Sequence, residues 1–98
     1  MSIVHIVRFP ASIEQHKRVE ELHPGLYERI IAMAREYGLV AHRRVYRDNE
    51  LMDIDEWESE EGMKAFAAAA APLLKQIAEA RGSGPPTVES WTPFEQAP

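Results

Sequence analysis

The side chains best suited to chemistry gather in residues 50–59 (ELMDIDEWES). Strict alternation along this expected strand places Asp53, Asp55 and Trp57 on one face. Two carboxylates this close in a dry site would raise the pKa of one of them, as acid–base catalysis requires. Burying either carboxylate unpaired would cost several kcal/mol, so each must have a partner elsewhere in the chain.

A histidine in the first expected strand, residues 2–9 (SIVHIVRF), is one such partner. His5 would lie on a strand next to the aspartates. A carboxylate beside an imidazole raises its pKa and fixes its tautomer, which suits a general base or a substrate hydrogen bond. We therefore expect His5, with Asp53 or Asp55, to be catalytic if the protein is an enzyme. The alternative is a core histidine that a local hydrogen bond satisfies.

The expected strand at residues 39–47 (LVAHRRVYR) offers competing partners. A connecting loop of two or four residues would place Arg44 opposite Asp53 and His42 opposite Asp55, whereas a three-residue loop would place Arg43 opposite Asp55. Opposite charges favour both registers, so the sequence leaves this choice open. His42 and Arg44 are also candidates for substrate binding.

Three aromatic side chains are candidates for the wall of a site for a planar ligand: Trp57, Phe66 and Trp91. Aromatic residues at strand ends and on inward helix faces also build ordinary cores, and Phe66 fits that alternative best.

Neither metal nor thiol chemistry is indicated. The sequence has no cysteine, which excludes thiolate ligands and nucleophiles and fits a reducing cytoplasm. His5, His42, Asp53 and Asp55 could surround a metal ion, but no HxH or HxxxE spacing demands it. We predict no metal and no cofactor.

The remaining patterns predict an α+β domain. Ser12 and Gln15 form a capping box before a first helix that breaks at residues 23–25 (HPG), and a stronger helix over residues 24–37 ends before Gly38. Ser59 caps another helix that runs to residue 81 through five alanines (residues 67–71) and Pro72. Residues 87–94 form the last strand.

The order β-α-β-β-α-β is that of the ferredoxin-like split βαβ fold, with a four-stranded antiparallel sheet and the first and third strands at its centre. Residues 1–98 would form this single domain. The alanine run predicts either close packing of its helix on the sheet, which native packing density favours, or a cavity beneath it if the protein is an enzyme.

Two helices cover only one face of four strands. The other face would expose an apolar row that includes Val4 with Ile6 and Met52 with Ile54. Exposed apolar patches of this size mark interfaces, so we expect a homodimer that pairs the two sheets.

The chain resembles the dimeric α+β barrel superfamily in residues 5–9 (HIVRF), residues 37–39 (YGL) and residues 55–66 (DEWESEEGMKAF). The last segment is similar to antibiotic-biosynthesis-monooxygenase-like proteins, and the first resembles stress-responsive A/B-barrel proteins. The resemblance implies cofactor-free oxygenation, cyclisation or isomerisation of small, often aromatic or polyketide-like, molecules between sheet and helices.

A cyclase-like member would use a strand-one histidine, which His5 matches. Its other polar positions fall at Leu51, Phe66 and Pro72. These losses favour a non-catalytic ligand-binding scaffold. Our leading hypothesis is a small-molecule-binding protein or enzyme of the cofactor-independent monooxygenase type, and the alternatives are a cyclase or isomerase and the scaffold.

Composition limits the other classes of partner. The apolar fraction of 45% and charged fraction of 28% are typical of soluble globular domains. A net charge of −5 argues against nucleic-acid binding. No apolar run approaches the roughly 18 residues of a membrane span, and no signal-peptide pattern is present.

Overall fold

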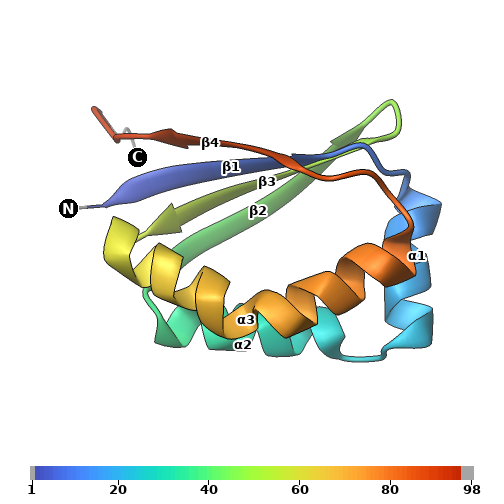
Figure 1. Cartoon of the computed structure of the whole chain (residues 1–98). Helices are drawn as coiled ribbons and strands as arrows, with labels where there is room; N and C mark the ends of the chain where they lie inside the picture. Colours follow the sequence, from blue (N-terminus) through green and yellow to red (C-terminus); the bar gives the residue numbers. More distant parts are fainter. Residues whose placement is uncertain (1, 96–98) are drawn as a thin grey trace.

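A computed structural model describes residues 2–95 of the chain. The elements are β1 (Ile3–Phe9), α1 (Ile13–Leu22), α2 (Leu26–Glu36), β2 (Leu39–Arg47), β3 (Glu50–Trp57), α3 (Glu60–Arg81) and β4 (Thr87–Trp91). In this part of the chain the strands form one four-stranded antiparallel sheet in the order β2-β3-β1-β4 (Figure 1). The predicted ferredoxin-like arrangement, with β1 and β3 central, is confirmed.

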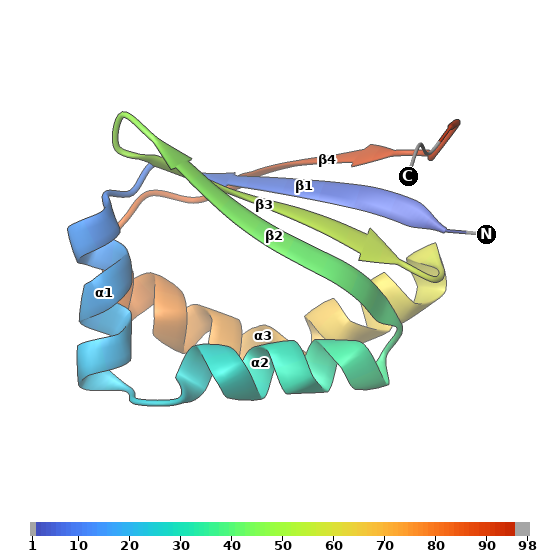
Figure 2. The ribbon, with the colours of Figure 1, turned by 180° about the vertical axis from the view of Figure 1, so that it is seen from behind.

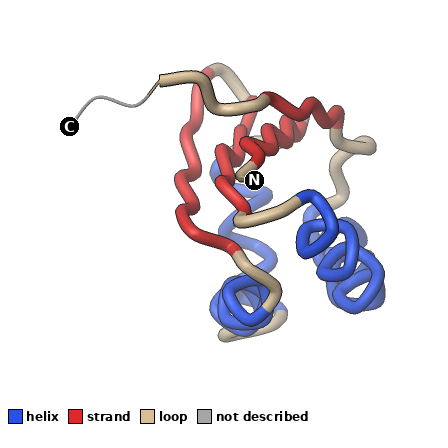
Figure 3. The backbone as a smooth tube through the Cα atoms, turned by 90° about the vertical axis from the view of Figure 1, so that its left-hand side faces the viewer, coloured by secondary structure: helices blue, strands red, loops and turns tan. Residues whose placement is uncertain are grey.

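The helices lie on one side of the sheet (Figure 3). α2 and α3 run beneath the strands, and α1 stands at one end, where it joins the strand layer to the helix layer (Figure 2). The capping box at Ser12 and Gln15 is present at the start of α1. The predicted break at residues 23–25 separates α1 from α2 completely, because Gly25 has a left-handed φ of 80° that an α-helix cannot contain. None of the described helices has the length and apolar character needed to cross a membrane.

The turn between β2 and β3 determines the register of the two strands. Asp48 and Asn49 both have positive φ, 45° and 61°, as the two central residues of a type I′ hairpin turn require. This two-residue connection places Arg44 opposite Asp53 and His42 opposite Asp55. The three-residue alternative is therefore wrong.

α3 is one continuous helix of 22 residues despite Pro72. Figure 1 shows it bending along its length, as expected when proline removes a hydrogen bond inside a helix. Its first turn lies against the link between α2 and β2. A Cβ atom on Gly62 would stand 2.3 Å from the carbonyl oxygen of Tyr37, so only glycine allows this approach.

The buried core is divided into two clusters. One contains Val19, Leu26, Ile30 and Ile77, near the end that α1 closes. The other contains Ala34, Leu39 and Trp57, near the opposite end of the sheet. The region between sheet and helices is therefore packed at its two ends.

Candidate functional site

A cavity of about 450 Å³ lies between the sheet and helices α2 and α3. Inward-facing residues from all four strands line it, and its α3 wall includes Ala67 and Ala78. Since these side chains are small, they leave space where larger ones would reach the sheet. Close packing of α3 on the sheet was therefore the wrong expectation, and the volume is typical of a small-molecule site.

The cavity opens between α3 and β4. Its solvent-exposed lining residues lie on these elements and on the segment that joins them: Ala67, Leu74, Lys75, Ala78, Gly84, Pro86 and Val88. β4 is an edge strand of the sheet. A ligand would enter from this side and meet the polar groups of β2 and β3 opposite.

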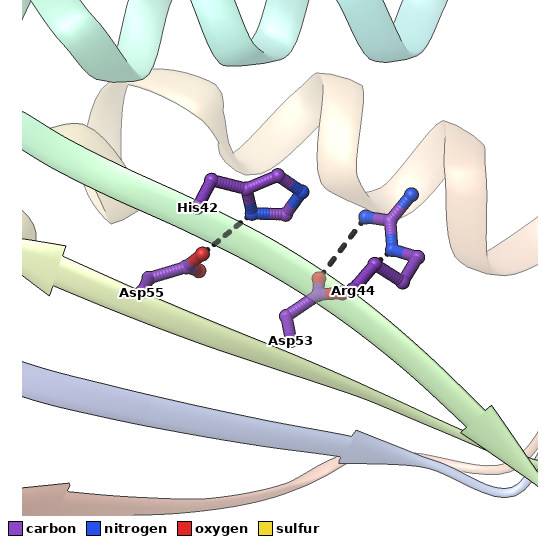
Figure 4. Close-up of polar contacts among 4 residues, drawn as sticks. All are labelled: His42, Arg44, Asp53 and Asp55. Atoms are coloured by element: carbon purple, nitrogen blue, oxygen red, sulfur yellow. Dashed lines mark hydrogen bonds and ion pairs between the residues drawn. The ribbon is translucent and has the colours of Figure 1, made fainter.

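Asp53 forms a bidentate ion pair with Arg44 on the cavity wall (Figure 4). Arg44 Nε donates to Asp53 Oδ1 over 2.6 Å and Nη2 donates to Oδ2 over 3.0 Å. Burial lowers the pKa of Arg44, but the hydrogen bond and charge of Asp53 outweigh burial and raise this pKa overall. Asp53 itself is only 8% exposed. Arg44 therefore compensates the burial of this carboxylate.

Asp55 contacts His42, two residues along the same strands from the Arg44–Asp53 pair (Figure 4). His42 Nδ1 lies 2.5 Å from Asp55 Oδ1. An ionised carboxylate only accepts, so Nδ1 carries the proton and Nε2 of a neutral ring is left as an acceptor. This is the geometry of an imidazole base oriented by a carboxylate.

His5 lies on the other side of Asp55, directly across from it on β1. Its Nδ1 is 3.5 Å from Ser90 Oγ on β4, and among the described residues no hydrogen bond joins it to either aspartate. Burial lowers the pKa of His5 from its ordinary value of 6.5, and the charge of Asp55 opposes this effect. His5 lines the cavity, but the histidine in contact with a carboxylate is His42, which sequence reasoning had assigned to substrate binding.

Two of the three expected aromatic side chains line the cavity. Trp57 and Phe66 contact each other with ring centroids 5.2 Å apart. Trp91 does not belong to this wall, because its pairing with Val4 places it on the outer face of β4, where it is 58% exposed. The expectation for Trp91 was therefore wrong, since the register of β4 turns Val88 inward instead.

When the chain is compared with known proteins, the matches that are found are to solved structures. No family model and no curated protein matches the sequence. A monooxygenase of Streptomyces coelicolor, ActVA-Orf6, solved with the ligand nanaomycin D, shares 26% identity at a TM-score of 0.68, over 98% of this chain and 90% of that one. SnoaB, a cofactor-independent oxygenase of Streptomyces nogalater, shares 16% identity at a TM-score of 0.69, over 99% and 97%. Rv0793 of Mycobacterium tuberculosis shares 16% identity at 0.70, over the whole of both chains.

The chain shares its fold with antibiotic-biosynthesis-monooxygenase-like proteins, which confirms the resemblance predicted from the sequence.

The His42–Asp55 and Arg44–Asp53 pairs bring three side chains of metal-ligating types together. One ligand atom from each of His42, Asp53 and Asp55 lies within 4.8 Å of the others. Both oxygens of Asp53, however, already accept hydrogen bonds from Arg44, whose positive charge would repel a cation. The Arg44 guanidinium therefore disfavours a metal ion at this cluster.

Sequence reasoning missed Tyr27 and Arg81, which line the cavity and have buried polar atoms. Tyr27 lies one turn before Ile30 and Ile31, so helical spacing could have indicated its inward position. Arg81 is the last residue of α3, where a basic side chain usually stabilises the helix dipole from the surface. Here it is only 6% exposed, and no local pattern signals that burial.

Proposed function

We propose that this protein is a cofactor-independent monooxygenase-like enzyme whose substrate is a small aromatic or polyketide-like molecule. The observation that carries the proposal is an apolar cavity whose floor holds an imidazole oriented by a carboxylate, His42 on Asp55. Fold similarity to a cofactor-independent oxygenase and to a monooxygenase supports the choice of reaction.

The reaction uses dioxygen as the oxidant and the substrate as the source of electrons. His42 Nε2 removes a proton from an acidic ring CH₂ or phenol group, and the resulting anion reduces O₂. For a ring CH₂ the balance is R₂CH₂ + O₂ → R₂C=O + H₂O, so one oxygen atom enters the product and the other leaves as water. The substrate carbon loses the four electrons that O₂ gains, and the proton held by His42 returns with the water.

The remaining cavity residues have supporting roles in this scheme. Asp55 orients His42, and Asp53 holds the Arg44 guanidinium on the cavity wall. His5 faces the substrate as a hydrogen-bonding partner beside Asp55. Trp57 and Phe66 provide the aromatic surface against which a planar ring system stacks.

Oxygen uptake tests this function. A tricyclic anthrone added to the purified protein in EDTA-containing buffer should consume one O₂ for each quinone formed, faster than in protein-free buffer. Binding of the anthrone without accelerated oxygen uptake would contradict the enzyme and support the scaffold alternative. Product formation without oxygen uptake would support a cyclase or isomerase.

We further propose that the outer sheet face forms a homodimer. This face carries half-buried Ile6 and Ile54 and exposed Trp91, and its Arg8 is already neutralised by Glu89 over 2.9 Å. Its apolar surface can therefore be buried without stranding that charge.

A lysine on this face should separate the two copies. Light scattering of the Ile54→Lys variant is expected to give the mass of one chain, and the wild type should give that of two. Ala32→Lys, on the exposed side of α2, is the matched control and should remain dimeric. A monomeric wild type at micromolar concentration would overturn the proposal.

A further inference from the structure

Arg81 is a buried cation without a carboxylate partner among the described residues. Its side chain lines the cavity, and its Nε is buried with no hydrogen-bond partner in this part of the chain. The guanidinium carbon lies 4.2 Å from the centroid of the Phe9 ring, which compensates only part of its lost hydration. The pKa of Arg81 is accordingly lowered by burial.

The carboxylate whose charge acts on the Arg81 guanidinium, Asp53, is already paired with Arg44. Asp53 raises the pKa of Arg81 slightly against the effect of burial, but both of its oxygens accept from Arg44. The hydroxyl of Tyr27 is also buried without a partner among the described residues. Tyr27 packs against the core cluster that contains Ile77, one helical turn before Arg81 on α3. In keeping with this placement, the positive charge of Arg81 opposes the rise that burial causes in the Tyr27 pKa. Two unpaired donors therefore lie toward the same end of the cavity.

We infer that this end of the cavity is an anion subsite, in which Arg81 and Tyr27 hold an anionic oxygen of an aromatic ligand, either a carboxylate or a phenolate. A guanidinium and a phenol hydroxyl both donate, so the complementary group is an acceptor, and a negative one gives the stronger hydrogen bonds. The inference rests on the proposed function only in taking the ligand to be aromatic.

The register of the sheet sets the direction of such a ligand. Phe9, beneath Arg81, lies opposite Leu51 at the start of β3. Asp55 and Trp57 follow four and six residues later on the same inward face, about 13 and 20 Å along the strand. A ligand held by its anionic oxygen at Arg81 therefore extends its rings along the cavity toward His42.

Binding of inert probes tests the subsite. By calorimetry at pH 7.5, the wild type should bind 2-naphthoate at least tenfold more tightly than the neutral isostere 2-naphthamide. Arg81→Gln should abolish this preference, and Arg35→Gln, which removes an exposed arginine from α2, should retain it. The 4-nitro-1-naphtholate anion distinguishes the two possible ligand groups. A subsite for phenolates should bind it more tightly than 2-naphthoate, and a subsite for carboxylates should bind 2-naphthoate more tightly.

The stability of the variants distinguishes a binding role from a structural one. Without ligand, Arg81→Gln should unfold at the same or a higher temperature than the wild type, because it removes an unpaired buried charge. If this variant does not fold, Tyr27→Phe, which loses one donor alone, should weaken the naphthoate preference several-fold. Equal affinity of the wild type for naphthoate and naphthamide, or a preference unchanged in both variants, would overturn the subsite. Neither probe has an oxidisable CH₂, so this result is independent of oxygen uptake.

Discussion

The Arg44→Met variant is expected to lose about 3–5 kcal/mol of unfolding free energy. It leaves the Asp53 carboxylate, only 8% exposed, with two unpaired oxygens that Arg44 satisfies in the native protein. Urea denaturation followed by circular dichroism measures the change.

Two further variants isolate the cause of this loss. Arg43→Met removes a neighbouring exposed arginine from β2 and should change stability by less than about 0.5 kcal/mol. The double variant Arg44→Met/Asp53→Leu should recover most of the loss, because apolar side chains then replace both partners of the ion pair. A double variant as unstable as Arg44→Met would show that the loss arises from packing of the long Arg44 stem.

The His42→Gln variant is expected to lower the turnover of an oxidisable substrate by about 10²–10⁴-fold, the range that a positioned general base contributes. Glutamine retains a donor toward Asp55 but cannot accept the substrate proton. Oxygen uptake at saturating substrate measures turnover, and circular dichroism verifies the fold.

His5→Gln is the matched comparison, because His5 lies on the other side of the same carboxylate. We expect it to affect KM more than kcat, as for a substrate hydrogen bond that does not transfer the proton. A large loss of kcat in His5→Gln, with His42→Gln near wild type, would return the role of base to His5.

In the hairpin between β2 and β3, the local sequence pattern predicted which side chains share a face but not which residues pair across the two strands. Alternation along residues 50–57 correctly placed Asp53, Asp55 and Trp57 on one face. The partners of the two aspartates depended on the length of one turn. Charge pairing favoured both registers by similar amounts, whereas the positive φ angles of Asp48 and Asn49 selected the two-residue turn.

For the alanine run, the sequence predicted the helix but not its distance from the sheet. Its helical position was clear from the sequence, yet small side chains are compatible with a close contact and with a void. The outcome depends on where α1, the Gly62 contact with Tyr37 and the two core clusters hold α3 relative to the sheet. These contacts join residues distant in sequence, so no local window contains them.

The sequence alone determined the element order, the central strands of the sheet and the carboxylate face of β3, because the period of two in strands and the capping signals of helices are local properties. Only the tertiary structure decided that His42 contacts Asp55, that Trp91 faces outward and that Arg81 is buried in the cavity wall. Each of these depends on strand register or on where a helix ends over the sheet. A shift of one residue in register reverses which face a side chain occupies, and the free energies that select the register are distributed over the whole domain.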